Sequence, residues 1–170
     1  MQKITPFLWF DKNCEEAINF YVSVFKENPK ASMKRSEVIS IKRYPDGPLE
    51  PPMQGMEGKV LTAVFELSGQ QFMALDGGPV FKPTAATSFY VECKTQEEVD
   101  YFWNRLSVNP AFEQCGWLQD AYGFSWQIIP KILPELLNDS DKEKANRVMQ
   151  AMLKMKKIDI RALKKAAKGK

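Results

Sequence analysis

The side chains able to do chemistry in this chain are carboxylates, thiols, phenols, lysines and amides, because its 170 residues include no histidine. Histidine is the commonest general base and metal ligand, so Ser-His-Asp and Cys-His nucleophile systems and two-histidine zinc or iron sites are excluded. The three cysteines, Cys14, Cys93 and Cys115, form no C-x-x-C pair, which excludes a thiolate zinc site. Their odd number, with no signal peptide pattern before Ile4, predicts reduced thiols and a cytoplasmic protein.

Two predicted helices that position these side chains share one sequence pattern, at an offset of 82 residues. The segments are 13-NCEEAINFYVSV-24 and 95-TQEEVDYFWNRL-106. In the second, apolar residues recur at i, i+3, i+4 and i+7, which places one apolar stripe along a helix, and the first matches it. Each begins with Asn13 or Thr95 followed three residues later by Glu, so both are predicted to start with a capping box. The repeat indicates a duplicated unit.

Predicted strands flank both helices. The segments 3-KITPFLWF-10 and 86-ATSFYVEC-93 precede them and are aromatic and β-branched, while 69-GQQFMALDGGP-79 and 121-AYGFSWQIIP-130 each turn near glycine and enter an apolar strand. Each unit is therefore a strand, a helix, and two or three further strands. The second is about 30 residues shorter between helix and last strand, because the first contains a long loop with the Pro/Gly-rich stretch 45–55.

Residues 131–170 have no counterpart in either repeat, so the prediction is a domain over 1–130 made of repeats 3–79 and 84–130, then a helical extension. Helices are expected over 141–155, capped by Asp141, and over 158–167. The first has a Met- and Ala-rich face that suits packing on the sheet exterior or on a second subunit, which favours a homodimer.

The C-terminal segment is strongly basic, with eight cationic residues between Lys154 and Lys170 against Asp159 alone. A solvated helical tail is the favoured interpretation. Nucleic acid is a less favoured partner, because no aromatic residue interrupts the run to stack on bases. No apolar stretch reaches the roughly 18 residues of a membrane span, so no membrane partner is expected.

The segment 114-QCGWLQDAYGFSWQIIP-130 resembles the PhnB-like branch of the glyoxalase/bleomycin-resistance/dioxygenase superfamily, also called vicinal oxygen chelate proteins. Members of this branch often carry the name 3-demethylubiquinone-9 3-methyltransferase. The resemblance spans nearly the whole chain and includes 4–11, 15–25, 70–79, 97–103 and 144–160. It implies an α+β fold of two βαβββ modules forming a cupped mixed sheet around a cleft, here followed by C-terminal helices.

Active members of the superfamily typically hold a divalent metal with four His or Glu side chains on the first and last strands of each module. Matching the motifs places these positions at Thr5, at Met73 or Leu75, at Ser88 and at Gln127, and none of these is a good ligand. We therefore expect no metal and no cofactor.

The cleft-facing residues implied by the resemblance follow from strand alternation. The predicted ligand-binding residues are Thr5, Phe7, Trp9, Ser88, Tyr90, Glu92 and Gln127. For Phe7 and Trp9, filling of the core is an equal alternative.

Other candidate residues receive structural interpretations. Trp117 and Trp126 are predicted to be core residues, and Cys115 is interpreted as a small buried hydrophobe rather than a reactive thiol. Asp76 and Glu92 are the carboxylates expected nearest the cleft, as solvated strand-end residues in preference to a proton-transfer pair.

These observations favour a protein that binds an unidentified small molecule without a catalytic metal. One alternative is a metal-dependent lyase or dioxygenase with a variant site. Another is the methyltransferase of the family name, which needs an S-adenosylmethionine pocket with a glycine-rich loop after a strand. The one candidate loop, 76-DGGP-79, is followed by proline rather than by a helix, so this alternative has the weakest chemical support.

Overall fold

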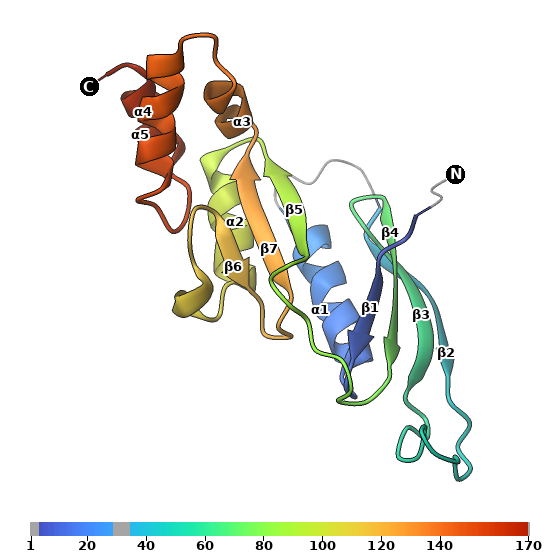
Figure 1. Ribbon diagram of the computed structural model, residues 1–170. Coiled ribbons are helices and arrows are strands. Elements are labelled where there is room, and N and C mark those ends of the chain that lie inside the picture. The colour runs from blue at the N-terminus through green and yellow to red at the C-terminus, as the bar shows by residue number, and fades with distance from the viewer. Residues whose placement is uncertain (1–3, 29–34, 170) are drawn as a thin grey trace. The chain divides into compact units, whose positions relative to one another are not determined.

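The computed structural model describes residues 4–28 and 35–169 (Figure 1). The chain divides into an N-terminal unit, Met1–Pro83, and a C-terminal unit, Thr84–Lys170. Each unit contains one mixed sheet and at least one helix, so the α+β class is confirmed. No helix in the described ranges combines the length and apolar character needed to span a membrane.

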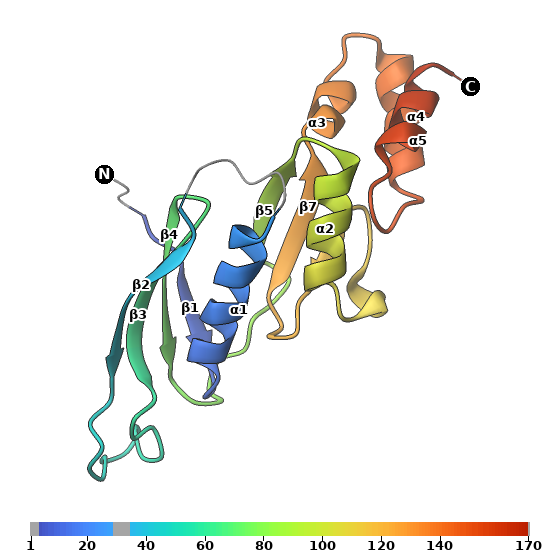
Figure 2. The same cartoon turned by 180° about the vertical axis from the view of Figure 1, so that it is seen from behind.

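The N-terminal unit is a four-stranded sheet with one helix on one face, as Figure 2 shows from behind. Its strand order is β1-β4-β3-β2, with β1 parallel to β4 and the other neighbours antiparallel. The elements are β1 (Phe7–Phe10), α1 (Cys14–Lys26), β2 (Glu37–Arg43), β3 (Val60–Leu67) and β4 (Gln70–Asp76). This is the predicted βαβββ order, although β1 begins four residues later than the predicted segment 3–10.

Strand alternation sorts the side chains of β1 between the two faces of this sheet. Leu8 and Phe10 are buried, whereas Phe7 is exposed and Trp9 is half-buried. The apolar stripe of α1 is buried, with Ala17 and Tyr21 fully inaccessible. The helix therefore covers one face, and Phe7 and Trp9 belong to the other, which we call the open face.

The C-terminal unit repeats this plan with one strand fewer. Its sheet has the order β5-β7-β6, with β5 parallel to β7 and β6 antiparallel to it. The elements are β5 (Ser88–Cys93), α2 (Gln96–Leu106), the short 3-10 helix η1 (Pro110–Phe112), β6 (Trp117–Gln119) and β7 (Ser125–Pro130). The second module is thus βαββ rather than βαβββ, because the short connection after α2 holds only a single 3-10 turn.

Three helices follow this sheet: α3 (Ile132–Leu137), α4 (Lys142–Met152) and α5 (Ile160–Ala167). The prediction included α4 and α5 but missed α3, which begins immediately after β7. Their shared core consists of Ile129, Leu133, Val148, Ile158 and Leu163, each at most 6% exposed. Because Ile129 belongs to β7, this core joins the helices to the sheet.

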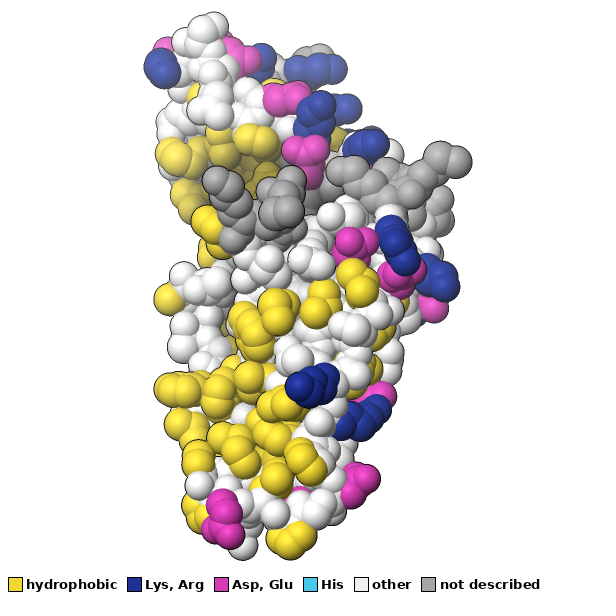
Figure 3. All heavy atoms as spheres, turned by 90° about the vertical axis from the view of Figure 1, so that its right-hand side faces the viewer, with side chains coloured by type: hydrophobic (Ala, Val, Ile, Leu, Met, Phe, Trp, Pro, Cys, Tyr) yellow, Lys and Arg dark blue, Asp and Glu magenta, His cyan; other side chains and the backbone are white. Residues whose placement is uncertain are grey.

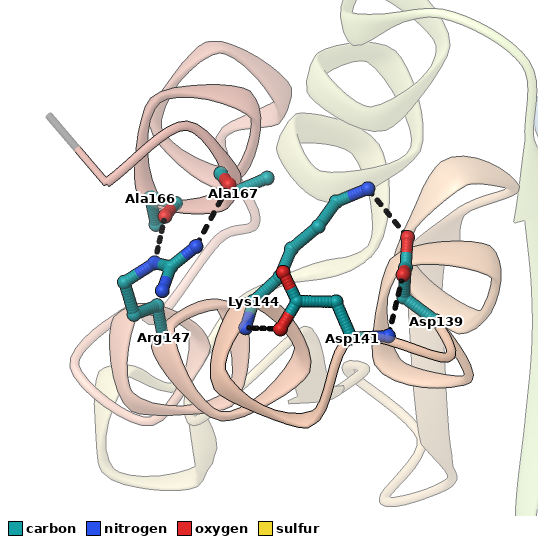
Figure 4. A network of polar contacts seen from close by, with 6 residues as sticks. All are labelled: Asp139, Asp141, Lys144, Arg147, Ala166 and Ala167. Atoms are coloured by element: carbon teal, nitrogen blue, oxygen red, sulfur yellow. Dashed lines mark hydrogen bonds and ion pairs between the residues drawn. The ribbon is translucent and has the colours of Figure 1, made fainter.

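Polar contacts hold α4 against its neighbours (Figure 4). The predicted cap of α4 is confirmed, since Asp141 Oδ1 accepts the amide of Lys144 at 3.1 Å. The Lys144 ammonium pairs with Asp139 before the helix. Arg147 donates from Nε to Ala166 O at 3.2 Å and from Nη2 to Ala167 O at 3.3 Å, which satisfies carbonyls at the end of α5.

The two predicted capping boxes have different outcomes. Thr95 accepts the amide of Glu98 at 3.3 Å, as predicted, and Glu98 Oε2 accepts the amide of Lys94 at 2.6 Å. Asn13 makes no side-chain cap, so the prediction for α1 was wrong. The amide of Cys14 instead donates to Asp76 Oδ1 at 2.9 Å, and a carboxylate from the end of β4 therefore performs the role expected of Asn13.

Candidate functional site

Three of the predicted ligand-binding residues meet on the sheet of the C-terminal unit. β5 and β7 run parallel with Tyr90 paired to Gln127 and Ser88 paired to Ser125, so their side chains share one face. Gln127 Nε2 donates to Ser88 Oγ at 2.8 Å. The structure thus places an amide, a hydroxyl and a phenol side by side on the face of this sheet opposite the buried Trp126.

A pocket of about 250 Å³ opens beside this group, and we call it the β7 pocket. The sheet and the preceding hairpin contribute Tyr90, Cys115, Trp117, Gln127 and Ile129, and the C-terminal helices contribute Leu133, Pro134, Leu137 and Met152. The lining is mostly apolar with a few polar groups, which is the usual composition of a small-molecule site.

The helical part of this lining was missed by sequence reasoning. The prediction assigned the C-terminal helices to the sheet exterior or to a subunit interface, whereas α3 and α4 supply one wall of the β7 pocket. The signal that could have found α3 is the apolar run 128-IIPKILPELL-137, which continues directly from the last strand.

Alternation along the short strand β6 corrects one prediction and confirms another. Trp126 is 2% exposed and is core, as predicted. Trp117 is half-buried and lines the β7 pocket, because it pairs with Gln127 while its neighbour Leu118 pairs with Trp126 on the buried face.

The turn that carries Cys115 fixes the C-terminal segment to the sheet. The amides of Cys115 and Gly116 donate to Met155 O at 2.8 Å and Lys156 O at 2.7 Å. Gly116 has φ +87°, and a Cβ there would lie 2.6 Å from Ile129 Cδ1, so both conformation and space require glycine.

The three cysteines are free thiols with different surroundings. Burial, reinforced by the Asp76 carboxylate, raises the pKa of Cys14 to about 12. Burial beside Glu98 does the same for Cys93, so both remain protonated and inert. Cys115 is only half-buried and lines the β7 pocket, which corrects its interpretation as a buried hydrophobe.

The chemistry available in the β7 pocket is hydrogen bonding from neutral groups. Burial, with a smaller contribution from Glu92, raises the pKa of Tyr90, so its phenol stays protonated. Glu92 itself is exposed at the end of β5. The pocket therefore offers amide, phenol and thiol donors and acceptors within apolar walls.

The remaining predicted residues, Thr5, Phe7 and Trp9, belong to the N-terminal unit. Phe7 is 49% exposed and Thr5 is half-buried. Trp9 donates from Nε1 to Gly78 O at 2.9 Å and makes an edge contact with Phe81. A Cβ on Gly77 would lie 2.2 Å from the indole, so only glycine lets Trp9 pack this closely against the backbone on the open face. We call Gly77 and Gly78 the glycine support of Trp9.

Asp76 has a structural role rather than the solvated one that the sequence suggested. It is 1% exposed, and its two oxygens accept the amides of Cys14 and Val60, each at 2.9 Å. These two hydrogen bonds account for a buried carboxylate at position 76 without a catalytic role.

The residues that the resemblance places at metal positions do not suit a divalent cation. Thr5, Ser88 and Gln127 are neutral, and Gln127 already donates to Ser88. Across residues 4–28 and 35–169, no group of three or more Cys, Asp or Glu side chains is arranged to hold a metal.

Comparison with known proteins connects the whole two-module region to one family. The model of the family described as 3-demethylubiquinone-9 3-methyltransferase matches residues 2–129. A PhnB protein from Bacillus cereus, whose name gives 3-demethylubiquinone-9 3-methyltransferase as a provisional activity, is 41% identical. That match covers 74% of this chain and 97% of the Bacillus protein, with a TM-score of 0.57.

A crystal structure of a protein from Pseudomonas aeruginosa is more distant, at 22% identity and a TM-score of 0.52, over 74% of this chain and 95% of that one. This likeness concerns the fold alone. None of the curated proteins matches the chain.

Proposed function

Because the chain belongs to the 3-demethylubiquinone-9 3-methyltransferase (PhnB-like) family, we propose that it is a small-molecule binding protein of the glyoxalase/bleomycin-resistance type. The observation that carries the proposal is the β7 pocket, where Tyr90 and Gln127 meet apolar walls from the sheet and from the C-terminal helices. Its volume of about 250 Å³ suits a ligand smaller than a typical drug.

The pocket's polar groups define the ligand class. The Gln127 amide, oriented by its hydrogen bond to Ser88 Oγ, can exchange hydrogen bonds with a carbonyl or hydroxyl, and the protonated Tyr90 can donate. Among the described residues, no lysine or arginine lines the pocket, so an anionic ligand would enter without a counter-ion. A neutral, compact molecule with one or two oxygen functions fits best.

Binding is tested by a thermal-shift screen of small neutral carbonyl and hydroxyl compounds, followed by titration of any compound that stabilises the protein. Gln127→Leu should weaken binding by about tenfold, the loss of one hydrogen bond. Gln119→Leu is the matched control, because Gln119 lies on β6 outside the pocket and donates only to Gly123 O at 3.2 Å. Equal losses in both variants, or none in Gln127→Leu, would contradict the proposed site.

The same titration examines the N-terminal unit, where Thr5, Phe7 and Trp9 remain predicted ligand contacts. Trp9→Ala should weaken binding by about 1–3 kcal/mol, the scale of a lost buried aromatic contact. Unchanged affinity in the folded variant would assign Trp9 to the packing of its own sheet.

We also propose that the protein functions without a bound metal. The neutral side chains at the superfamily's metal positions support this, and elemental analysis of the purified protein should find no stoichiometric divalent ion. About one equivalent of zinc, nickel, manganese or iron per chain would favour the variant-site lyase or dioxygenase instead. Methyl transfer gains no support, because the loop 76–79 is followed by β5 rather than by a helix.

The proposed assembly is a homodimer, supported by the apolar surface of the N-terminal unit. Large hydrophobic side chains are exposed there, with Val80 at 72%, Phe81 at 63% and Ile39 at 45%. Figure 3 shows hydrophobic side chains gathered together on the surface, with few charged groups among them. Contiguous apolar patches of this kind usually mark an interface.

Light scattering should give twice the chain mass of 19.5 kDa at micromolar concentration. Phe81→Asp should shift the protein toward the monomer, because it places a charge in the proposed interface. A wild-type mass of 19.5 kDa would contradict the dimer.

We place the protein in the cytoplasm. The free state of Cys14, Cys93 and Cys115 supports this, because disulfides are rare in reducing compartments. Cell fractionation tests the location, and recovery in a secreted fraction would contradict it.

A further inference from the structure

We propose that a basic pocket of the C-terminal unit binds a small anion carrying several phosphate groups. This pocket has a volume of about 780 Å³ and lies between the N-terminal ends of α2 and α5. Its lining consists of Lys94, Thr95, Gln96, Asp159, Ile160, Arg161, Lys164, Lys165 and Lys168. Five cationic side chains thus surround it, against one carboxylate.

In the tertiary structure, carboxylates neutralise some cations of the basic C-terminal segment and leave others unpaired within the part of the chain that is described. Lys156 pairs with Glu113 at 3.3 Å and Lys157 pairs with Asp100 at 2.7 Å. In contrast, the five cations of the basic pocket are exposed, and none of their side chains forms an ion pair with another residue in the described ranges. The segment is therefore not a uniformly solvated tail, because Arg161, Lys164, Lys165 and Lys168 surround one cavity.

The helix geometry of α5 produces this concentration. Arg161, Lys164, Lys165 and Lys168 occur at i, i+3, i+4 and i+7, which places them on one face, while Leu163 on the other side is fully buried. Like charges at this spacing destabilise an isolated helix by a few tenths of a kcal/mol per pair. A bound anion would relieve that repulsion.

The side-chain amide of Gln96 holds the two walls in place. Its Nε2 donates to Ile158 O at 3.0 Å, and its Oε1 accepts the amide of Ile160 at 2.9 Å. The first turn of α5 is thereby fixed to the first turn of α2, so the cavity is built into the fold rather than formed by a free tail.

The helix ends themselves are not the site. Thr95 accepts the amide of Glu98, and Asp159 Oδ1 accepts the amide of Ala162 at 2.9 Å. Both first turns are already capped, so recognition rests on the side-chain cations.

The shape and chemistry of the basic pocket favour a small polyphosphate-type anion over larger anionic partners. Its volume is within the usual range for small-molecule sites. Arg161 can bind a phosphate with two parallel hydrogen bonds, and the lysines supply point charges. In the part of the chain that the structure describes, no aromatic residue lines the pocket to stack on a base. Ile160 is the only large apolar residue of this described lining, too little for insertion into a lipid surface.

Calorimetric titration with inorganic tripolyphosphate tests the proposal. The expected result is one site per chain, with affinity that falls as salt is raised. The triple variant Lys164→Gln, Lys165→Gln, Lys168→Gln should lose at least about tenfold in affinity, because it removes three charge-assisted contacts. The control triple Lys131→Gln, Lys142→Gln, Lys154→Gln makes the same change in net charge at exposed positions outside the pocket and should stay within about twofold.

A third variant separates a built cavity from a flexible basic tail. Gln96→Ala changes no charge but removes both contacts to the start of α5, and it should weaken tripolyphosphate binding several-fold with helix content retained by circular dichroism. Unchanged affinity in Gln96→Ala, or equal losses in the two lysine triples, would overturn the proposal. So would tighter binding of single-stranded DNA or of phosphatidylserine vesicles than of tripolyphosphate at equal ionic strength.

Discussion

The two units build the same sheet-and-helix plan and differ in what completes it. In each, the first strand of the module lies at the edge of its sheet and pairs in parallel with the last strand. A helix covers one face of each sheet. In the C-terminal unit, α3 and α4 add a wall beside β7, and a pocket forms there. In the described part of the N-terminal unit, α1 is the only helix, and the open face holds Trp9 on its glycine support. The β7 pocket thus depends on the segment that follows the second copy of the module.

The units also differ in how each helix begins. The start of α2 is capped by Thr95 from the adjacent sequence, whereas the start of α1 depends on Asp76, 62 residues away from Cys14. Both kinds of capping satisfy a backbone donor of the first turn, but only the long-range contact connects the helix directly to the sheet.

The largest expected effect comes from breaking that long-range cap. Asp76→Ala should lower the free energy of unfolding by about 3 kcal/mol, because it leaves two buried amides without an acceptor. Thr95→Ala, the matched change in the other unit, should cost about 1 kcal/mol. Urea unfolding of both variants measures the difference. An equal or smaller loss for Asp76→Ala would mean that α1 is held mainly by its apolar face.

The glycine support of Trp9 gives the next effect. Gly77→Ala places a methyl group where the indole lies, so the ring must move, and stability should fall by about 2 kcal/mol, as in other overpacked sites. The tryptophan emission should shift at the same time. Gly47→Ala is the control, since nothing lies within 4 Å of a Cβ there. If the two variants behave alike, the indole is not held against Gly77.

Arg147→Met tests how strongly α4 holds α5. The variant loses the two hydrogen bonds to the end of α5 and should destabilise that helix by about 1 kcal/mol. Hydrogen exchange should quicken in α5 and leave β3 of the N-terminal unit unchanged. Faster exchange throughout both units would show that these helices do not unfold separately.

The smallest effect is a pH dependence confined to the C-terminal unit. Burial opposes ionisation of Asp100, but hydrogen bonds from Lys157 and Gln96 outweigh it and lower its pKa. A hydrogen bond from Ser107, followed by one from Lys156, lowers the pKa of Glu113. Since both folded values lie below the unfolded ones, the stabilisation is fully present above the ordinary carboxyl pKa of about 4 and is lost as pH falls through the lower folded values.

Amides of residues 153–160 should therefore become less protected between pH 6 and pH 3, after correction for intrinsic exchange. Lys157→Met should remove part of this pH dependence. Identical profiles for the variant and the wild type would show that the Lys157–Asp100 pair contributes nothing measurable, as is common for exposed pairs.

The sequence alone determined the elements of this fold, because periodicity and caps are local properties. The 82-residue repeat located α1 and α2, Asp141 correctly predicted the start of α4, and the shortened second repeat agreed with its missing strand. Alternation and the family resemblance also predicted that Ser88, Tyr90 and Gln127 face the same side, and the pairing of β5 with β7 places them on one face of the sheet.

Only the tertiary structure decided which side chains from distant segments meet. Asp76 caps the start of α1, Leu137 and Met152 line the β7 pocket, and Gln96 holds the start of α5. Each of these contacts joins separate elements of the fold. A one-dimensional pattern specifies the face of each element but not the neighbour on that face. For the same reason, charge counting described the basic segment as a solvated tail, whereas packing neutralised Lys156 and Lys157 and gathered the four cations of α5 and its C-cap around one cavity.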